Sequence, residues 1–85
     1  MPLKVGKTMV LHCAAVGVPT PTISWLKNNI PLQNSNRITV TSGGALIIKS
    51  AVPQDVGEYL CVGRNPAGKA TAAVLLWSEG GMLNT

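Results

Sequence analysis

Apolar and polar residues alternate along several short segments of the chain, and most of these segments end near glycine, proline or asparagine. An alternation with a period of two is typical of a β-strand that has one buried face and one solvated face. No segment of useful length shows the period of an α-helix. The pattern predicts strands over residues 8–15, 22–27, 30–32, 37–41, 45–49, 57–64 and 69–77.

The segments between these strands have the composition of turns. Residues 17–21 contain two prolines, Asn28 is followed by a second asparagine, and Gly43 is followed by a second glycine. Residues 65–68 (Asn-Pro-Ala-Gly) predict a type I turn closed by a glycine with positive φ. Pro31 restricts its segment to a sheet edge because it has no N–H to donate.

About seven short strands separated by such turns favour a sandwich of two antiparallel sheets. Residues 50–56 must then connect one layer to the other. We expect residues 1–77 to form this single domain and residues 78–85, which contain two adjacent glycines, to form a linker or tail.

The chain has two cysteines, Cys13 and Cys61, at inward positions of different predicted strands. They lie far apart in sequence, which excludes a CxxC redox pair, and a single histidine, His12, makes a four-ligand metal site hard to build. Trp25 is also predicted to point inward. We therefore favour a disulfide between the sheets that packs on the indole, and we expect no metal and no cofactor.

A disulfide that closes so long a loop would stabilise the fold by roughly 4 kcal/mol on the chain-entropy model. It favours an oxidising compartment. Residues 1–4 are followed by no apolar signal-peptide core, and no apolar run approaches the ~18 residues of a membrane span. We therefore expect the chain to be a piece of a longer secreted protein.

Several residues together resemble the immunoglobulin superfamily. They are Leu11, Cys13, Trp25 and the segment 55–61, Asp-Val-Gly-Glu-Tyr-Leu-Cys. The short interval between Trp25 and Leu46 leaves no room for the extra strand of variable domains. The patterns Asn65-x-x-Gly68 and Gly17-x-Pro19-x-Pro21 resemble the intermediate, or I-set, type. The resemblance implies an all-β, immunoglobulin-like antiparallel sandwich with Greek-key connections, of the kind found in tandem arrays of matrix and adhesion proteins.

The resemblance also implies structural roles for single residues. It implies a Cys13–Cys61 bridge with Trp25 against it, a Tyr59 hydroxyl that returns to the backbone near Asp55, and an ion pair between Asp55 and Arg37. Leu11, Leu46 and Gly57 are assigned to the structural framework.

The first strand of the family is expected to be absent or vestigial, since only four residues precede Val5. The edge of the strand predicted over residues 8–15 would then be bare, and a bare edge invites pairing with another chain.

We expect no catalytic site. His12 alternates outward and has no acid or serine partner with a suitable spacing, and the acids Asp55, Glu58 and Glu79 do not suggest a carboxylate pair. The glycines also lack the spacing of a phosphate-binding loop.

The net charge of +4 comes from basic residues that are dispersed along the chain. Nucleic acid is excluded as a partner because single-strand binding needs exposed aromatic residues, and Trp25 belongs to the core. A polyanion such as heparan sulfate is a candidate ligand for Lys4, Lys7 and Lys69, because the residues before the first cysteine are expected to run beside the last strand. The alternative is a dispersed charge that only adds solubility.

An apolar patch is predicted on the outer face of the sheet formed by residues 22–27, 57–64 and 69–77. If Ala70, Ala72, Val74 and Leu76 face inward, Ala73, Leu75 and Trp77 face outward. Such a face is commonly polar, so an apolar patch is a candidate contact surface. Alternatively, these residues serve only β-propensity. The candidate interface consists of Leu26, Leu60, Val62, Ala73 and Leu75.

The expected function is that of a non-catalytic, extracellular interaction module of a larger multi-domain protein that contributes to cell–cell or cell–matrix adhesion, through a protein partner or by self-association. Two alternatives stay open. One is a structural spacer in a tandem immunoglobulin array, including an intracellular muscle protein in which the cysteines stay reduced. The other is a glycosaminoglycan-binding module.

Overall fold

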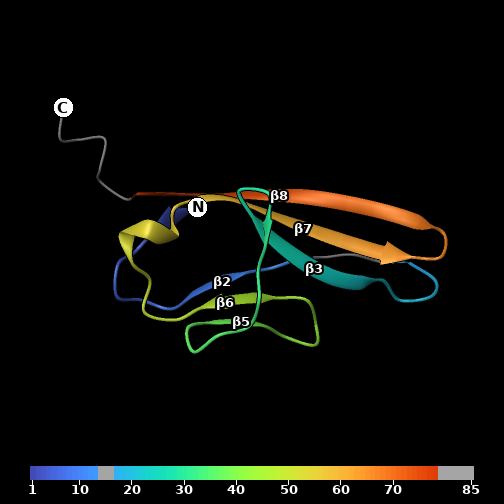
Figure 1. The fold of residues 1–85 in the computed structure, drawn as a ribbon, viewed down its shortest axis with the longest axis horizontal. Coiled ribbons are helices and arrows are strands. Elements are labelled where there is room, and N and C mark those ends of the chain that lie inside the picture. The colour runs from blue at the N-terminus through green and yellow to red at the C-terminus, as the bar shows by residue number, and fades with distance from the viewer. Residues whose placement is uncertain (14–16, 79–85) are drawn as a thin grey trace.

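Two β-sheets pack against each other in the computed structural model, which describes residues 1–13 and 17–78 (Figure 1). The larger sheet has the strand order β1-β8-β7-β3-β4, and the smaller sheet has the order β2-β6-β5. The larger sheet consists of β1 (Pro2–Leu3), β3 (Thr22–Lys27), β4 (Ile30–Pro31), β7 (Gly57–Asn65) and β8 (Gly68–Ser78). The smaller sheet consists of β2 (Met9–Leu11), β5 (Ile38–Val40) and β6 (Leu46–Ile48). The predicted all-β sandwich is confirmed.

All neighbouring strands pair in the antiparallel direction except β1 and β8, which pair in parallel. β1 pairs in parallel with the end of β8, where Pro2 lies opposite Trp77 and Leu3 opposite Ser78. β1 has only two residues, so the first strand is vestigial, as predicted. It pairs with β8 and not with β2, and among the described residues no strand pairs with the edge of β2 opposite β6. Ser78 is the last residue of β8 and not the first residue of a tail, and residues 79–85 lie outside the described part of the chain.

Two turns form as their sequences predict. Asn28 and Asn29 connect β3 to β4, and both have positive φ, at 49° and 69°. This is the geometry of a two-residue type I′ turn, whose twist matches that of the strands. At the β7–β8 turn the side-chain oxygen of Asn65 accepts hydrogen bonds from the backbone N–H groups of Ala67 (2.9 Å) and Gly68 (3.2 Å).

The strands of the smaller sheet are shorter than the alternation predicts. The strand predicted over residues 8–15 is regular only at Met9–Leu11, and its residues 14–16 lie outside the described part. β5 and β6 also have three residues each. Alternation predicts which face of the sheet a side chain occupies, but it does not predict the length of a strand. That length depends on the pairing partner, and β2 pairs with only three residues of β6.

The core lies between the two sheets. Leu11, Leu46 and Ile48 of the smaller sheet and Trp25, Tyr59, Cys61 and Leu76 of the larger sheet are almost completely buried. Residues 50–56 cross from β6 to β7 as predicted, and they include the short 3₁₀ helix η1 (Pro53–Asp55).

The β7–β8 hairpin is much longer than the smaller sheet (Figure 1). Ala70 and Ala72 lie on the same side of β8 as Val74 and Leu76, as predicted. They are nevertheless exposed, whereas Leu76 is buried. A side chain can point toward the inner face without being covered, and the three-residue strands of the smaller sheet are too short to cover the whole hairpin.

Candidate functional site

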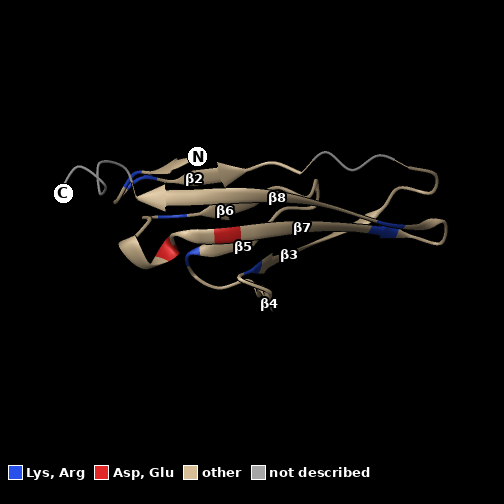
Figure 2. Ribbon diagram, turned by 90° about the horizontal axis from the view of Figure 1, so that it is seen from above, with Lys and Arg blue, Asp and Glu red and all other residues tan. Residues whose placement is uncertain are grey.

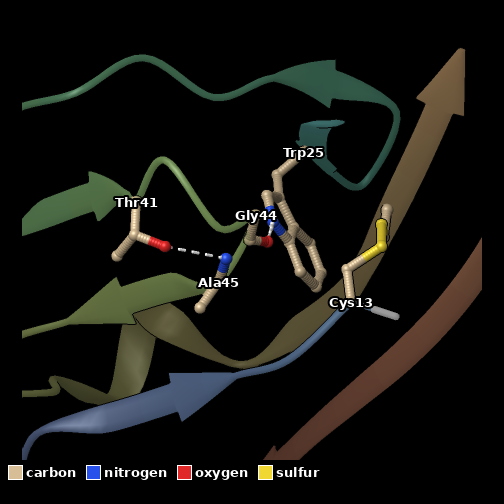
Figure 3. Close-up of a disulfide and its surroundings, with 6 residues drawn as sticks. Cys13, Trp25, Thr41, Gly44 and Ala45 are labelled. Carbon is tan, nitrogen blue, oxygen red and sulfur yellow. Dashed lines mark hydrogen bonds between the residues drawn. A yellow bond between two sulfur atoms is a disulfide. The ribbon is translucent and has the colours of Figure 1, made fainter. Parts of the chain in front are cut away.

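A disulfide and a tryptophan fix the centre of the sandwich. Cys13 is bonded to Cys61, with a Cα–Cα distance of 6.2 Å, and the indole of Trp25 lies close to the bridge (Figure 3). Trp25 lies directly opposite Cys61 in the β3–β7 register. The indole Nε1–H donates a hydrogen bond of 2.9 Å to the backbone carbonyl of Gly44, which attaches the loop between β5 and β6 to the larger sheet.

Gly44 is required at that loop position. Its φ is +93°, in the region that disfavours other residues, and an added Cβ would lie 2.8 Å from the Cγ1 atom of Ile23. The paired glycines at 43 and 44 predict a turn, but the acceptor for Trp25 could be identified only from the structure.

A second polar cluster holds the crossover at the base of the sandwich. The Tyr59 hydroxyl donates a 2.6 Å hydrogen bond to the backbone carbonyl of Asp55. The Asp55 carboxylate accepts hydrogen bonds from both terminal nitrogens of Arg37, at 3.0 and 3.1 Å, and from the Val52 N–H at 2.9 Å. These partners are the ones that the family resemblance implies for Tyr59, Asp55 and Arg37.

The pKa values of this cluster follow from its contacts. Burial alone would raise the pKa of Asp55, but the hydrogen bonds from Arg37 and Val52 and the positive charges of Arg37 and Lys27 outweigh it, so that the pKa is lowered. Burial, together with the Asp55 charge, raises the pKa of Tyr59 to about 12. Tyr59 therefore stays a neutral donor and Asp55 a charged acceptor at physiological pH, which makes the cluster a structural clamp.

The outer face of the larger sheet carries a row of apolar residues. Leu26 lies opposite Pro31 on one side and Leu60 on the other, and Leu60 in turn lies opposite Ala73. Residues that lie directly opposite each other project their side chains to the same face. We call this set, together with Leu75 in the next row, the apolar row.

The members of the apolar row differ in exposure. Leu75 is 57% exposed and Ala73 is also exposed, whereas Leu26 and Leu60 are half-buried. The sequence prediction includes Val62, but Val62 is only 6% exposed and offers little surface to a partner. Pro31 also belongs to the row, although the alternation does not predict it, because its pairing with Leu26 follows from the β3–β4 turn.

The basic residues predicted to lie together do not do so. Lys4 and Lys7 lie near the end of β8, where β1 pairs with Ser78, whereas Lys69 lies near the start of β8 at the β7–β8 turn. Figure 2 shows basic segments at the end of the molecule near the N-terminus and others at the tip of the hairpin. The prediction is wrong for Lys69, because β1 pairs only with the last two residues of β8 and does not run along its whole length.

Lys49, and not Lys69, is the basic residue of another strand end that lies near the N-terminal segment. The Ala51 N–H donates to the Lys7 carbonyl at 2.9 Å, and the Lys7 N–H donates to the Lys4 carbonyl at 3.1 Å, so the end of β6 lies beside the N-terminal segment. All three lysines are exposed. The antiparallel pairing of β2 with β6 is the signal that would have identified Lys49.

His12 is exposed, as its alternation predicts. Among residues 1–13 and 17–78, no three histidine, cysteine or acidic side chains gather in a way that could hold a metal ion. The same residues contain no helix that is long and apolar enough to cross a membrane.

The family model of the immunoglobulin I-set domain matches residues 1–77 of the chain. The chain belongs to the immunoglobulin I-set family.

Relatives of this I-set domain occur in large proteins. The chain is 43% identical over 77 residues to the basement membrane-specific heparan sulfate proteoglycan core protein of Mus musculus, covering 91% of this chain and 2% of that protein. It is 40% identical over 83 residues to the netrin receptor DCC of Homo sapiens, covering 91% of this chain and 6% of the receptor. The solved structure of Sidekick-1 immunoglobulin domains 1–4 is similar, with a TM-score of 0.82, 36% identity and coverage of 88% of this chain and 20% of that chain.

These comparisons show that the chain is an immunoglobulin module of the type found in adhesion and matrix proteins. The I-set domain spans only a few per cent of the length of the two relatives.

Proposed function

We propose that this I-set domain is a non-catalytic, extracellular contact module, and that the apolar row is the surface by which it binds a protein partner. The observation that supports this most directly is the continuous line of Pro31, Leu26, Leu60 and Ala73 across four strands, beside the 57%-exposed Leu75. The outer face of an antiparallel sheet is commonly polar, and a contiguous apolar set on such a face marks an interaction site.

The chemistry of the row fits a protein surface better than a charged ligand. Its side chains provide no cation and no hydrogen-bond donor, so its contribution to binding is burial of apolar area, at about 25 cal/mol per Å². Glu58 lies opposite Leu75 and is exposed, which places one acidic group at the rim of the row. An apolar centre with a polar rim is the usual anatomy of a protein–protein interface.

We expect the variant Leu60→Arg to lose binding to its partner. Leu60 lies in the middle of the row on β7, and an arginine there would place a charge that a partner must desolvate, which costs several kcal/mol in a buried interface. The measurement is saturable binding of the fluorescently labelled domain to cultured cells and to a deposited basement-membrane matrix.

The matched control is Val10→Arg, which places the same side chain on the smaller sheet at a residue that is 38% exposed. Binding that is lost with Leu60→Arg and kept with Val10→Arg supports the proposal. Equal binding by both variants and the unchanged domain would remove the apolar row from the function, and an absence of saturable binding would favour a spacer role.

We propose a second ligand class, a sulfated glycosaminoglycan, for the other end of the domain. It is supported by the backbone hydrogen bonds of Lys7 to Lys4 and to Ala51, which bring the N-terminal segment next to the residues that follow Lys49. All three lysines are exposed. Asp55, near the same end, is 4% exposed and already paired with Arg37, so it does not neutralise these lysines. Clustered basic groups attract polyanions in a salt-dependent manner.

We expect Lys49→Glu to weaken binding of a heparin oligosaccharide severalfold or more, because it reverses one charge of this cluster. Lys69→Glu changes the net charge by the same amount at the opposite end of β8 and should leave the affinity nearly unchanged. Calorimetric titration at two salt concentrations measures both. Equal losses from the two variants would show that only the net charge of the domain matters.

A further inference from the structure

Two basic side chains lie directly opposite each other near the tip of the β7–β8 hairpin. In the register of the two strands Arg64 pairs with Lys69, and both residues are exposed. The Cβ atoms of such a pair lie about 4.5–5.5 Å apart, and both side chains project to the same face of the sheet. We call Arg64 and Lys69 the cation pair.

No acidic side chain balances the cation pair within the described part of the chain. The acids there are Asp55, which is paired with Arg37, and Glu58. Glu58 precedes Arg64 by six residues on β7, a distance of about 20 Å along the strand. Figure 2 shows both acidic segments away from the tip of the hairpin. Because like charges that lie directly opposite each other destabilise a strand pair, the cation pair weakens the hairpin without compensation from a described acid.

The cation pair lies on the same face as the apolar row. Every second residue of a strand shares a face, so Arg64 lies on the face of Leu60, and one row, which consists of Ser24, Val62 and Thr71, lies between them. Arg64 and Leu60 are four residues apart on β7, which corresponds to ~13 Å. Ser24 and Thr71 are exposed and carry hydroxyl groups. The outer face therefore changes from cationic at the tip of the hairpin to polar and then to apolar.

A partner that covers the apolar row would also cover the cation pair. An ordinary protein interface takes ~800 Å² from each partner, which is a patch about 30 Å across. A patch of this size centred on Leu60 extends ~15 Å in each direction, and the cation pair lies within that distance. Removing two like charges from water costs free energy and strengthens their repulsion, unless the partner supplies an opposite charge.

We propose that the protein partner of the apolar row places a carboxylate on the cation pair. This inference rests on the proposed function, because it specifies the chemistry of the partner that the same surface binds. A carboxylate accepts charge-assisted hydrogen bonds from the Arg64 guanidinium and the Lys69 ammonium group, and its charge offsets their repulsion. The partner is therefore a protein surface that carries an acidic side chain ~13 Å from its apolar centre.

A protein carboxylate fits the cation pair better than a sulfated glycosaminoglycan chain. A sulfated chain is charged along its length and gains affinity from an extended series of cations. On the outer face of β3, β7 and β8 the cation pair is followed by hydroxyl and apolar side chains and by no further lysine or arginine. A charged group beside an apolar centre is instead the arrangement of a protein–protein interface.

The main test is the variant Lys69→Glu, which should weaken binding and stabilise the fold. It replaces a repulsive cross-strand pair by an attractive one, so the urea concentration at the midpoint of unfolding should rise. It also presents a like charge to the carboxylate of the partner and gives Arg64 an acid within the chain, so the Kd should rise roughly tenfold or more. A loss of affinity in a more stable domain cannot result from unfolding.

Binding is measured with the fluorescently labelled domain on deposited basement-membrane matrix that has been treated with heparinase to remove heparan sulfate. The double variant Thr8→Glu/Val10→Glu is the matched control, because it lowers the net charge as much as Lys69→Glu does, at two exposed residues of the smaller sheet and its entrance. Its Kd should stay close to that of the unchanged domain. Amidation of the matrix carboxylates with a carbodiimide and an amine should weaken binding of the unchanged domain to the level of Lys69→Glu.

The outcomes separate this inference from the proposed function. If Leu60→Arg binds as well as the unchanged domain, or if no saturable binding occurs, the proposed function fails and the role of the cation pair fails with it. If Leu60→Arg loses binding but Lys69→Glu loses no more than the matched control, only the role of the cation pair is overturned. Binding through the cation pair that disappears on heparinase treatment would assign the pair to a sulfated chain and would also overturn the proposal.

Discussion

Replacing Cys13 and Cys61 together by alanine should lower the free energy of unfolding by about 4 kcal/mol. The two residues are separated by 48 positions, so the disulfide removes much of the conformational entropy of the unfolded chain. A domain of this size buries only about 60–65% of the surface that its unfolded chain exposes, and its total stability is expected to be only ~5–15 kcal/mol. The loss is therefore a large fraction of the stability.

Urea unfolding followed by far-UV circular dichroism measures this loss. Reduction of the unchanged chain is the control, because it opens the bridge and keeps both sulfur atoms in the core, where Cys61 is 2% exposed. If reduction accounts for most of the loss, the effect comes from the cross-link; any additional loss in the alanine variant comes from packing. A reduced protein that is as stable as the oxidised one would contradict the prediction and would favour the spacer alternative in a reducing compartment.

The alternation of apolar and polar residues, together with the turn residues between the alternating segments, is enough to predict the sandwich. Trp25, Cys61 and Tyr59 point inward because of the period of a strand, and a strand has only two faces to choose from. The partners of Tyr59 and Asp55 came from the family resemblance, since nothing in the spacing of residues 37 and 55 requires a contact. Local sequence therefore determined the face of each residue but not its contacts.

The predictions that differ from the structure depend on the length and register of paired strands. The sequence predicts Lys69 beside Lys4 and Lys7 because the first and last strands are neighbours. Neighbouring strands pair over a limited length, however, and β1 and β8 pair over only two residues. The exposure of Ala72 has the same origin, since it depends on how far the smaller sheet extends. Register and strand length are properties of pairs of segments, so a pattern read along one segment could not supply them.

In the candidate site, too, the sequence predicts the face on which a residue lies but not its neighbours. Alternation predicts that Leu26, Leu60 and Ala73 share the outer face, but only the register shows that they form one continuous row. Val62 lies two residues after Leu60 and therefore on the same face, and yet it is nearly buried. The exposure of a residue on this face depends on the side chains of the neighbouring strands, which alternation along one strand does not predict. The contact surface that we propose is therefore narrower than the predicted one and extends toward β4 through Pro31.

The largest effect of a single substitution is expected for Trp25→Ala, which should cost about 3–5 kcal/mol of unfolding free energy. Trp25 is 2% exposed and packs close to the disulfide, so its removal leaves a cavity in the centre of the core. It also removes the hydrogen-bond donor to the carbonyl of Gly44, which is a buried residue. A buried acceptor without a partner costs about 1–3 kcal/mol, and part of this penalty is already included in the expected loss of about 3–5 kcal/mol.

Trp25→Phe separates the two contributions, because phenylalanine fills most of the space and provides no N–H. It should cost less than alanine and still destabilise the domain, with the loop between β5 and β6 affected most in amide hydrogen exchange. Trp77→Ala is the matched control: Trp77 is 44% exposed on the outer face, and its removal should cost less than about 1 kcal/mol. Similar losses from the two alanine variants, measured by urea unfolding with circular dichroism, would show that the indole of Trp25 is not the centre of the core. Faster exchange over the whole domain in Trp25→Phe would instead show that the Gly44 hydrogen bond supports the sandwich as a whole and not only one loop.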